Sequence, residues 1–489
     1  MGFLNFIYKH PLCLLTDFYQ LTMAYGYWKS GIHRNETAFH LCFRENPFKG
    51  GYSICCGLNF IIEYLSHFEF NEEDLAYLGS LRGGDEKPIF EPGFLEYLNN
   101  MRFCCDVDCV PEGTVVFPHE PLLRIIGPLI QCQLFETPLL NMMNFQTLIA
   151  TKSSRVCLAA RGDPVLEFGL RRAQGIDGAL SASRAAYIGG CVGTSNVLAG
   201  KVFDIPVKGT HAHSWIMAFE DELEALEAYA KALPNNCVFL VDTYDTLKGV
   251  RKAVQVGKWL RQNGHDMLGI RLDSGDLAYL SIEARKILDQ EGFSDCAIVG
   301  SNDLDEKIIE SLKEQGARIA VWGVGTKLVT AYDQPALGGV YKLSAIRKPR
   351  DSWQYKIKLS EQTAKINTPG ILQVRRFQSD KEFIGDMIYD VNLGIRNGAT
   401  MVDPLDMTRR KFIKKDTLFT ELLIPVFRKG ELVYQEPSIH EIREYTRKQL
   451  EFFHEGIKRF VNPHKYPVGL EQGLYDLKTK LILKARGIE

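Results

Sequence analysis

Residues 209–215, GTHAHSW, place two histidines, His211 and His213, between a short apolar run and a stretch with helical periodicity. A neutral imidazole is nucleophilic near pH 7, can transfer protons there, and can also bind a metal ion. A histidine at the end of a strand is, however, commonly a hydrogen-bonded packing residue. The neighbouring segments must therefore decide between chemistry and packing.

Polar residues follow each of six short apolar runs between positions 150 and 330. The runs are PVLEFG, FDIPVKGT, CVFLVDT, MLGIRLDSGD, CAIVGSND and RIAVWGVGT. Helical stretches such as TLKGVRKAVQVGKWLRQNG and LAYLSIEARKILDQEG lie between them, and this alternation is typical of βα units with parallel strands. Because the carboxyl ends of parallel strands share one edge, the segments LRR, THAHS, TYDT, DSGD, SND and GVGT are predicted to meet there.

The last two of these segments favour a phosphate site. They contain small polar residues and glycines, namely Ser301, Asn302, Asp303, Gly323, Gly325 and Thr326. Glycine lets backbone N–H groups approach an anion closely, and barrels commonly bind phosphate after their late strands. A tight βα turn is the alternative interpretation of the two glycines taken alone.

The other segments contribute charged groups. Asp273 can accept ribose hydroxyls or a hydrated magnesium ion, although it can also cap the helix that follows. Asp242 and Asp245 have the same two interpretations. Arg171 lies after the first strand, and a planar guanidinium binds a carboxylate through two hydrogen bonds. With a histidine and a phosphate loop, these groups indicate phosphoribosyl chemistry.

Six segments resemble motifs of the nicotinate phosphoribosyltransferases, in the order that the family has them. They are TDFYQLTMAYGYW, LEFGLRRAQGIDGALSASRAAYIGG, VGTSNVLAGKVFDIPVKGTHAHSW, LVDTYDTLKG, IRLDSGDL and WGVGTKLVT. The resemblance runs from residue 16 to about residue 330. It implies that nicotinate is joined to 5-phosphoribosyl-1-pyrophosphate (PRPP), giving nicotinate mononucleotide and pyrophosphate, and that ATP hydrolysis drives this step in the salvage of NAD.

The resemblance also implies residue roles. His213 is the histidine that ATP phosphorylates, and it forms the catalytic set with Arg271 and Asp273. The residues expected to bind substrate are Asp17, Tyr19, Phe168, Arg171, Ser195 and Thr210, and those expected to bind phosphate are Ser301, Asn302, Asp303, Gly323, Gly325 and Thr326. Tyr19 would enter the site of the partner subunit in a homodimer. Magnesium is expected as a cofactor with no direct protein ligand, held by Asp273 through water.

Three alternatives remain open. The first is a nicotinamide phosphoribosyltransferase. Those related enzymes have an acidic residue where this chain has Ser195, and because a carboxylate there would repel nicotinate, the serine favours nicotinate over nicotinamide as the substrate. A metal-dependent hydrolase barrel can begin with His211-x-His213, but it needs further histidines, and His265 precedes its strand. A non-catalytic ligand-binding barrel is the third alternative.

The composition limits the classes of binding partner and the cellular location that we expect for this protein. The 489 residues include 58 Lys and Arg against 60 Asp and Glu, a net charge of -2, so there is no general basic surface for nucleic acid or an anionic membrane. We find no run of about 18 apolar residues and no secretory signal, and the 12 cysteines are scattered through apolar segments. Cys104, Cys105 and Cys109 lack the paired spacing of a zinc site. We therefore expect a cytoplasmic protein with reduced thiols.

The elements that position the site form three predicted parts. Residues 1–150 are predicted to be an α+β domain, which begins with a helix capped by Thr16 or Asp17 and ended at Gly31. Residues 151–340 carry the active site in the α/β region. The resemblance implies an irregular (β/α) barrel of the type II phosphoribosyltransferase kind; spacing alone also permits an open doubly wound sheet. Residues 341–489 are expected to add strands and helices that pack on the barrel and the N-terminal domain.

Overall fold

A computed structural model describes residues 4, 7–8, 11–362, 365–395 and 399–488. The chain folds into two units, one formed by residues 1–148 and 336–489 and the other by residues 149–335. Both units combine helices with sheets, as the predicted α/β class requires. No helix within the described residues is long and apolar enough to cross a membrane.

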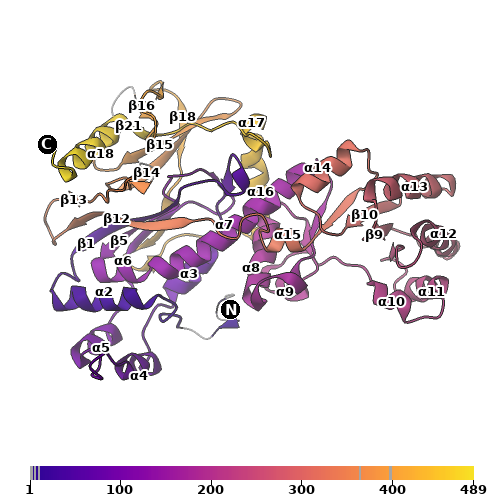
Figure 1. Cartoon of the computed structure of the whole chain (residues 1–489), viewed down its shortest axis with the longest axis horizontal. Helices are drawn as coiled ribbons and strands as arrows, with labels where there is room; N and C mark the ends of the chain where they lie inside the picture. The colour runs from indigo at the N-terminus through magenta and orange to yellow at the C-terminus, as the bar shows by residue number, and fades with distance from the viewer. Residues whose placement is uncertain (1–3, 5–6, 9–10, 363–364, 396–398, 489) are drawn as a thin grey trace. The chain divides into compact units, whose positions relative to one another are not determined.

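The first unit contains a seven-stranded sheet to which both ends of the chain contribute (Figure 1). In spatial order the strands are β13 (Gln354–Tyr355), β12 (Gly339–Arg347), β1 (Glu36–Phe43), β5 (Leu123–Pro128), β3 (Asp106–Cys109), β19 (Ile424–Arg428) and β20 (Glu431–Leu432). β1 lies between β12 and β5 and pairs antiparallel with both. The C-terminal segment therefore completes a sheet that the N-terminal segment begins.

A second sheet of the first unit is built from C-terminal residues alone. Its spatial order is β17 (Arg410–Phe412), β16 (Thr400–Val402), β21 (Val468–Glu471), β15 (Phe383–Asp390), β14 (Leu372–Gln378) and β18 (Leu418–Glu421). A separate two-stranded sheet is formed by β2 (Ser53–Ile54) and β4 (Val115–Val116). The helices among the described residues of this unit are α2 (Phe18–Lys29), η1 (Pro47–Lys49), α3 (Leu58–Ser66), α4 (Glu72–Ser80), α5 (Pro92–Asn99), α6 (Leu129–Leu134), the first part of α7 (Glu136–Ala159), α16 (Ile439–Glu451), α17 (Glu455–Lys458) and α18 (Gln472–Ala485). In Figure 1, α18 lies against β16 and β21.

Helix α2 confirms the predicted N-terminal element. Asp17 is its N-cap residue and Ser30 its C-cap residue, and Gly31 follows with φ 70°, a conformation that favours glycine. The Asp17 carboxylate does not cap the helix, because it accepts a hydrogen bond from Thr137 Oγ1 at 2.7 Å. The side chain of Asp17 therefore ties α2 to α7 within the first unit.

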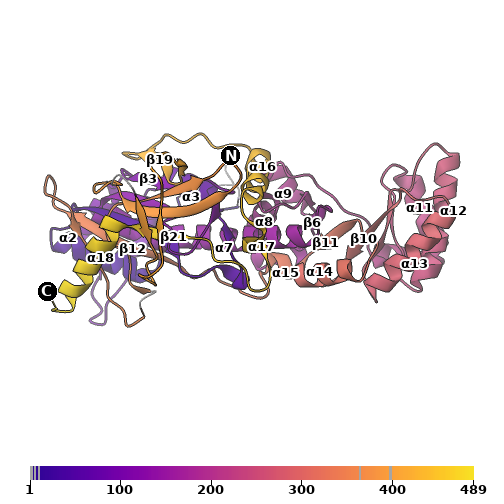
Figure 2. The same cartoon turned by 90° about the horizontal axis from the view of Figure 1, so that it is seen from above.

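The second unit is built on a six-stranded parallel sheet. Its spatial order is β7 (Gly193–Thr194), β6 (Val165–Glu167), β11 (Val321–Val324), β10 (Ala297–Ser301), β9 (Gly269–Leu272) and β8 (Val238–Leu240). Its helices are the rest of α7, η2 (Leu170–Arg172), α8 (Gly175–Ile188), α9 (Val197–Phe203), α10 (His213–Met217), α11 (Glu222–Ala232), α12 (Thr246–Gln262), α13 (Leu277–Gln290), α14 (Glu306–Glu314) and α15 (Thr326–Val329). Figure 2 shows α11, α12 and α13 side by side, in agreement with their packing.

Two predicted elements of this unit differ from the structure. The run FDIPVKGT does not form a strand, because Val207 makes only an isolated bridge to Thr194, and the strand at this position is Gly193–Thr194. The stretch with helical periodicity next to GTHAHSW forms two helices, α10 and α11, rather than one. The Asp221 carboxylate accepts a hydrogen bond from the Leu223 N–H and caps the second helix. Local periodicity did not reveal either interruption.

Candidate active site

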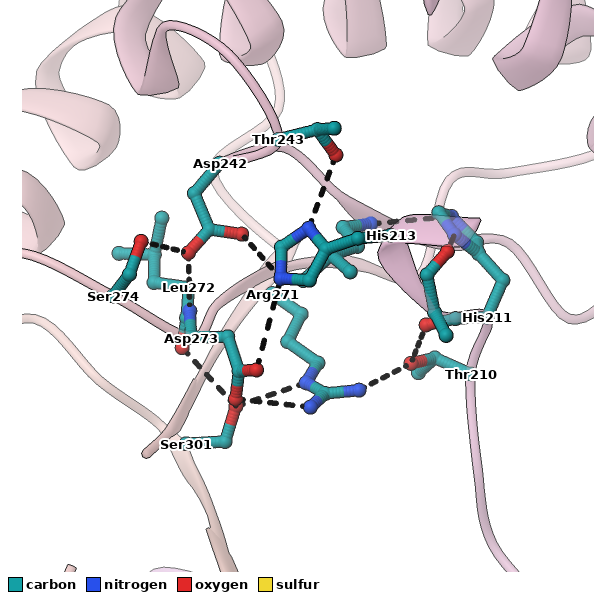
Figure 3. A network of polar contacts seen from close by, with 12 residues as sticks. Thr210, His211, His213, Asp242, Thr243, Arg271, Leu272, Asp273, Ser274 and Ser301 are labelled. Carbon is teal, nitrogen blue, oxygen red and sulfur yellow. Dashed lines mark hydrogen bonds and ion pairs between the residues drawn. The ribbon is translucent and has the colours of Figure 1, made fainter. Parts of the chain in front are cut away.

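Polar side chains gather at the carboxyl ends of the parallel strands in the second unit (Figure 3). β8, β9 and β10 are consecutive neighbours, and all their pairings are parallel, so their carboxyl ends lie along one edge. The predicted site residues within or just after these strands and β6, β7 and β11 are Phe168, Ser195, Arg271, Asp273, Ser301, Asn302, Asp303, Gly323, Gly325 and Thr326. The prediction of a shared edge holds for the polar segments that follow β6, β8, β9, β10 and β11, whereas THAHS does not follow a strand of the sheet.

His213 is the first residue of α10, and its ring lies between a hydroxyl and two carboxylates. Its Nδ1 is 3.1 Å from Thr243 Oγ1, while Nε2 is 4.0 Å from Asp242 Oδ1 and 3.8 Å from Asp273 Oδ2. The side chain is 39% exposed, so a dissolved molecule can reach it. The imidazole is thus accessible and is oriented by groups on both of its nitrogen atoms.

Asp242 is the buried acid of this arrangement. Its Oδ2 accepts hydrogen bonds from the Asp273 N–H at 2.8 Å and from Ser274 Oγ at 2.7 Å. Its Oδ1 is buried, has no hydrogen-bond partner among the described residues, and faces His213 Nε2. A buried carboxylate oxygen of this kind is costly unless a cation or a donor approaches it.

Arg271 connects the ends of β9 and β10 to the segment that contains Thr210. Its Nε donates to Ser301 Oγ at 2.9 Å, Nη1 donates to Thr210 Oγ1 at 3.2 Å, and Nη2 donates to Asp273 Oδ1 at 3.0 Å. The guanidinium carbon also lies 5.8 Å from the centroid of the Phe168 ring. These contacts fix the orientation of the guanidinium, which forms an ion pair with Asp273.

The Asp273 carboxylate remains ionised. Burial by itself would raise its pKa, but the hydrogen bond from Ser301 at 2.5 Å and the charge of Arg271 outweigh burial, and the pKa lies below the ordinary value. Asp273 is not the cap of the following helix, because Asp276 accepts from the Tyr279 N–H and caps α13. Asp245 likewise caps α12. The structure therefore separates the capping acids from Asp242 and Asp273.

His211 is a packing residue. It is 8% exposed, its Nε2 accepts from the Leu240 N–H at 3.2 Å, and its ring lies 4.8 Å from that of Tyr229. Burial lowers the pKa of His211 to about 4, so the ring is neutral at pH 7. Because Nε2 already accepts a hydrogen bond, the metal-binding interpretation of His211-x-His213 loses one of its nitrogen ligands.

The glycines of the predicted phosphate segment allow close packing. A Cβ on Gly323 would lie 2.7 Å from Phe168 Cδ2, and one on Gly325 would lie 2.9 Å from the Phe168 carbonyl oxygen. Both positions therefore need glycine. At the neighbouring strand end Asn302 has φ 123°, an unusual conformation that often marks functional loops.

The remaining predicted residues of this unit lie at the periphery of the network. Arg171 is exposed and forms no hydrogen bond or ion pair with another described residue, whereas Arg172 Nη1 donates to Thr326 Oγ1 at 3.3 Å. Ser195 is half-buried, and its N–H donates to the Glu167 carbonyl oxygen at 3.0 Å. The structure thus leaves the Arg171 guanidinium and the Ser195 hydroxyl available for a ligand.

Tyr19 and Asp17 belong to the first unit. Tyr19 is 48% exposed on α2, and the Asp17 carboxylate accepts from Thr137. An exposed aromatic ring of this size is suited to stacking on a planar ligand. The predicted role of Tyr19 in a partner subunit stays a prediction.

Thr243 is a contact of His213 that the sequence did not single out, and Asp242 was identified there only as an ambiguous acid. Both lie in the segment VDTYDT after β8, so a polar run at a strand end was the available signal. Thr243 lies 30 residues after His213 in the chain, so their contact depends on the tertiary arrangement of β8 and α10 and cannot be predicted from local sequence. Among the residues that the structure describes, no group of three His, Cys, Asp or Glu side chains is arranged to hold a metal ion.

Family models match most of the chain. The nicotinate phosphoribosyltransferase N-terminal domain matches residues 14–144, the nicotinate phosphoribosyltransferase family residues 164–354, and the nicotinate phosphoribosyltransferase C-terminal domain residues 373–478. The chain is 45% identical to the nicotinate phosphoribosyltransferase of Bacillus subtilis over 476 residues, which cover 96% of this chain and 95% of that protein. It is 32% identical to the nicotinate phosphoribosyltransferase of Homo sapiens over 527 residues, covering 96% of each.

Two solved structures are similar over nearly the whole chain. Human nicotinic acid phosphoribosyltransferase superposes with a TM-score of 0.82 at 31% identity and covers 95% of this chain and 99% of that one. Nicotinate-nucleotide pyrophosphorylase from Pyrococcus furiosus has the same fold, with a TM-score of 0.69 at 22% identity and coverage of 90% and 95%. The predicted α/β fold of the type II phosphoribosyltransferases is confirmed.

Proposed function

The chain belongs to the nicotinate phosphoribosyltransferase family, and from that premise we propose that it joins nicotinate to PRPP and couples this transfer to ATP hydrolysis through His213. The products are nicotinate mononucleotide and pyrophosphate, which places the reaction in NAD salvage. The observation that carries the proposal is the convergence of His213, two carboxylates and Arg271 at one edge of the parallel sheet.

In the transfer step, the ring nitrogen of nicotinate forms a bond to C1 of the ribose while the bond from C1 to the pyrophosphate oxygen breaks. The electron pair of that bond leaves with pyrophosphate. Arg271 is held rigidly by three acceptors and offers positive charge for the nicotinate carboxylate, and exposed Arg171 offers a second guanidinium. Phe168, beside Arg271, supplies an aromatic surface for the ring.

The PRPP sugar and its 5′-phosphate would lie along the remaining strand ends. The ionised Asp273 carboxylate accepts ribose hydroxyls, and we place the phosphate beside the backbone of Gly323 and Gly325, with Thr326 next to them. Ser301, Asn302 and Asp303 occupy the adjacent strand end, where we place the other side of the phosphate site.

Energy coupling uses the two nitrogen atoms of His213 differently. Carboxylates beside Nε2 favour the tautomer with the proton on Nε2, which leaves the lone pair on Nδ1. In this tautomer Nδ1 accepts the hydrogen bond from the Thr243 hydroxyl 3.1 Å away, and that hydrogen bond must break before Nδ1 attacks the γ-phosphorus of ATP. The bond to the bridging oxygen then breaks, and ADP leaves with its electron pair. Water later hydrolyses the phosphohistidine to phosphate and restores His213.

The carboxylates fit the expected magnesium ion. Asp242 Oδ1 is buried without a partner among the described residues, and Asp273 Oδ2 lies on the same side of His213 Nε2. These hard oxygen atoms would accept hydrogen bonds from the water shell of the ion. When bound, magnesium offsets the negative charge that develops on pyrophosphate as it leaves.

We propose nicotinate rather than nicotinamide as the substrate, because Ser195 adds no negative charge that would repel the carboxylate. The active assembly in this proposal is a homodimer in which Tyr19 stacks on the ligand of the partner subunit. All 12 cysteines are free thiols, which supports a reducing, cytoplasmic location.

The test combines purified protein, magnesium and PRPP with nicotinate or nicotinamide, with and without ATP, and measures mononucleotide and ADP together. We expect nicotinate mononucleotide to form and ADP to accompany it. Turnover of nicotinamide instead would contradict the argument from Ser195. Retained ligand binding without any transfer would indicate a non-catalytic barrel, and bound zinc in the purified protein would favour the hydrolase interpretation.

The His213→Ala variant separates the two activities. It removes the proposed nucleophile but leaves Arg271 and the phosphate site, so ATP hydrolysis should disappear while slow ATP-independent transfer remains. Unchanged ATP consumption by this variant would refute the phosphohistidine assignment.

A further inference from the structure

A cluster of charged side chains lies beside the two proposed phosphate segments, inside the second unit. It is formed by two residues of α7, two at the start of α14, one on α15 and one that follows α15, namely Lys152, Arg155, Asp305, Glu306, Lys327 and Asp333. Lys152 and Glu306 are 0% exposed and Arg155 is 1% exposed. None of these residues is among those that the proposed function assigns to ligand binding.

The cluster is connected by short ion pairs. Lys152 Nζ lies 2.7 Å from Glu306 Oε2 and 2.8 Å from Asp333 Oδ2, and Arg155 Nε lies 2.9 Å from Glu306 Oε1. These pairs connect α7 to the start of α14 and to the residues after α15. These ion pairs hold the three segments in place relative to one another.

A second pair joins the two phosphate segments more directly. Lys327, which follows Thr326, donates through Nζ to Asp305 Oδ2 at 2.9 Å, and Asp305 lies two residues after Asp303. The other carboxylate oxygen, Asp305 Oδ1, accepts from the Ile308 N–H at 2.8 Å and caps α14. One carboxylate therefore sets the start of α14 relative to the glycine-containing segment.

Such a cluster is an inefficient way to stabilise a fold. Buried charges lose their hydration, and well-packed apolar side chains of similar volume often stabilise a core as well or better. Ion pairs do, however, require particular positions and orientations of the groups that they join. This combination indicates a role in geometry.

We propose that Asp305 and Lys327, supported by Lys152, Arg155, Glu306 and Asp333, are positioning residues that set the separation of the two segments binding the 5′-phosphate of PRPP. The inference rests on the proposed function and deepens it. Because the backbone N–H groups of both segments must converge on one phosphate, a small change in their separation weakens PRPP binding more than nicotinate binding.

The decisive variant is Asp305→Asn. Its amide oxygen can still accept from the Ile308 N–H and keep the cap, whereas the charge that pairs with Lys327 is lost. We expect the KM for PRPP to rise about tenfold, since a 1 Å misplacement can cost about a hundredfold. The KM for nicotinate should stay close to the wild-type value, whereas the urea midpoint of unfolding should fall, because Lys327 loses its charged partner.

Lys313→Met is the matched control, because Lys313 lies at the other end of α14 and pairs with Asp163 at 2.6 Å. It removes a partly buried ion pair from the same helix but not from the phosphate segments, so the KM for PRPP should not change. Lys327→Met should raise the KM for PRPP as much as Asp305→Asn does, whereas Lys327→Arg keeps the positive charge and should have a KM close to the wild-type value. The double variant Asp305→Asn/Lys327→Met should have a KM for PRPP no higher than that of either single variant.

The proposal is overturned if Asp305→Asn and Lys327→Met leave the KM for PRPP unchanged, or if Lys313→Met raises it equally. It is also overturned if the KM for both substrates rises in step with a loss of stability. Absence of transfer by the wild-type protein would instead refute the proposed function, so the two failures are distinguishable.

Discussion

Replacing Asp242 by Asn tests the electrostatic part of the coupling mechanism. Asn is nearly the same size, and its side-chain oxygen can keep the hydrogen bonds from the Asp273 N–H and Ser274 Oγ that Asp242 accepts at 2.8 and 2.7 Å. What is lost is the negative charge of Oδ1, 4.0 Å from His213 Nε2. The change therefore isolates one charge while leaving the local backbone in place.

The size of the effect follows from that distance. As Nδ1 bonds to phosphorus with Nε2 still protonated, the ring gains positive charge, which the carboxylate stabilises. Opposite unit charges at 4 Å attract by about 4 kcal/mol at an effective dielectric constant of about 20. Because His213 is 39% exposed, solvent screens part of this attraction, and we take about 2 kcal/mol, or about a 30-fold slower phosphorylation.

The assay measures ADP release at saturating ATP and the acid-labile phosphate retained on the protein, for the wild type and for Asp242→Asn. ATP-independent transfer, measured at saturating magnesium, should change less than ADP release, since Asp242 does not contact the proposed nicotinate position and Asp273 can still accept hydrogen bonds from the water shell of the ion. Asp245→Asn is the control: it removes a charge from the same segment but can retain the cap of α12, so ADP release should stay within about twofold of wild type. Equal ADP release by Asp242→Asn and wild type would refute the electrostatic argument.

Three further predictions concern specificity, packing and pH. Ser195→Asp should raise the KM for nicotinate about tenfold, because a new carboxylate would repel that of the substrate, and an unchanged KM would contradict the role of this position. Gly323→Ala should lower the free energy of unfolding by about 1–3 kcal/mol in urea titrations, since its Cβ would lie 2.7 Å from Phe168 Cδ2; wild-type stability would show that the ring can move. Burial lowers the pKa of His211 to about 4, so the unfolded chain binds a proton near pH 6.5 that the folded chain excludes. The contribution of His211 to stability is therefore present above pH 6.5 and is lost as the pH falls toward 4, by up to about 1.4 kcal/mol per pH unit. His211→Gln should show a shallower decline, and equal slopes would assign the pH dependence to other groups.

Much of the fold was predictable because it is encoded locally. The runs CVFLVDT, MLGIRLDSGD, CAIVGSND and RIAVWGVGT contain strands β8 to β11 within a few residues, since short β-branched runs between helical stretches have few other solutions. The failures occurred where a tertiary contact overrides local pattern. The run FDIPVKGT has the composition of a strand, yet only Val207 forms a bridge, and the strand belongs to Gly193–Thr194.

The site divides in the same way. The types of its residues and their positions after strands were visible in the sequence, and the family motifs indicated which histidine matters. The sequence did not separate Asp242 from Asp245, because both follow the same strand in VDTYDT. Only their side-chain partners show that Asp245 caps α12 while Asp242 faces His213.

Sequence alone determined that this chain forms parallel βα units, that its polar residues follow the strands, and that its motifs are those of a nicotinate phosphoribosyltransferase. Tertiary structure decided which of those residues meet. The order β7-β6-β11-β10-β9-β8 makes neighbours of segments that are far apart in the chain, and it brings His213, Asp242 and Asp273 together. The physical reason is that periodicity and propensity act over a few residues, whereas strand order, burial and ion pairing depend on contacts between residues separated by tens or hundreds of positions.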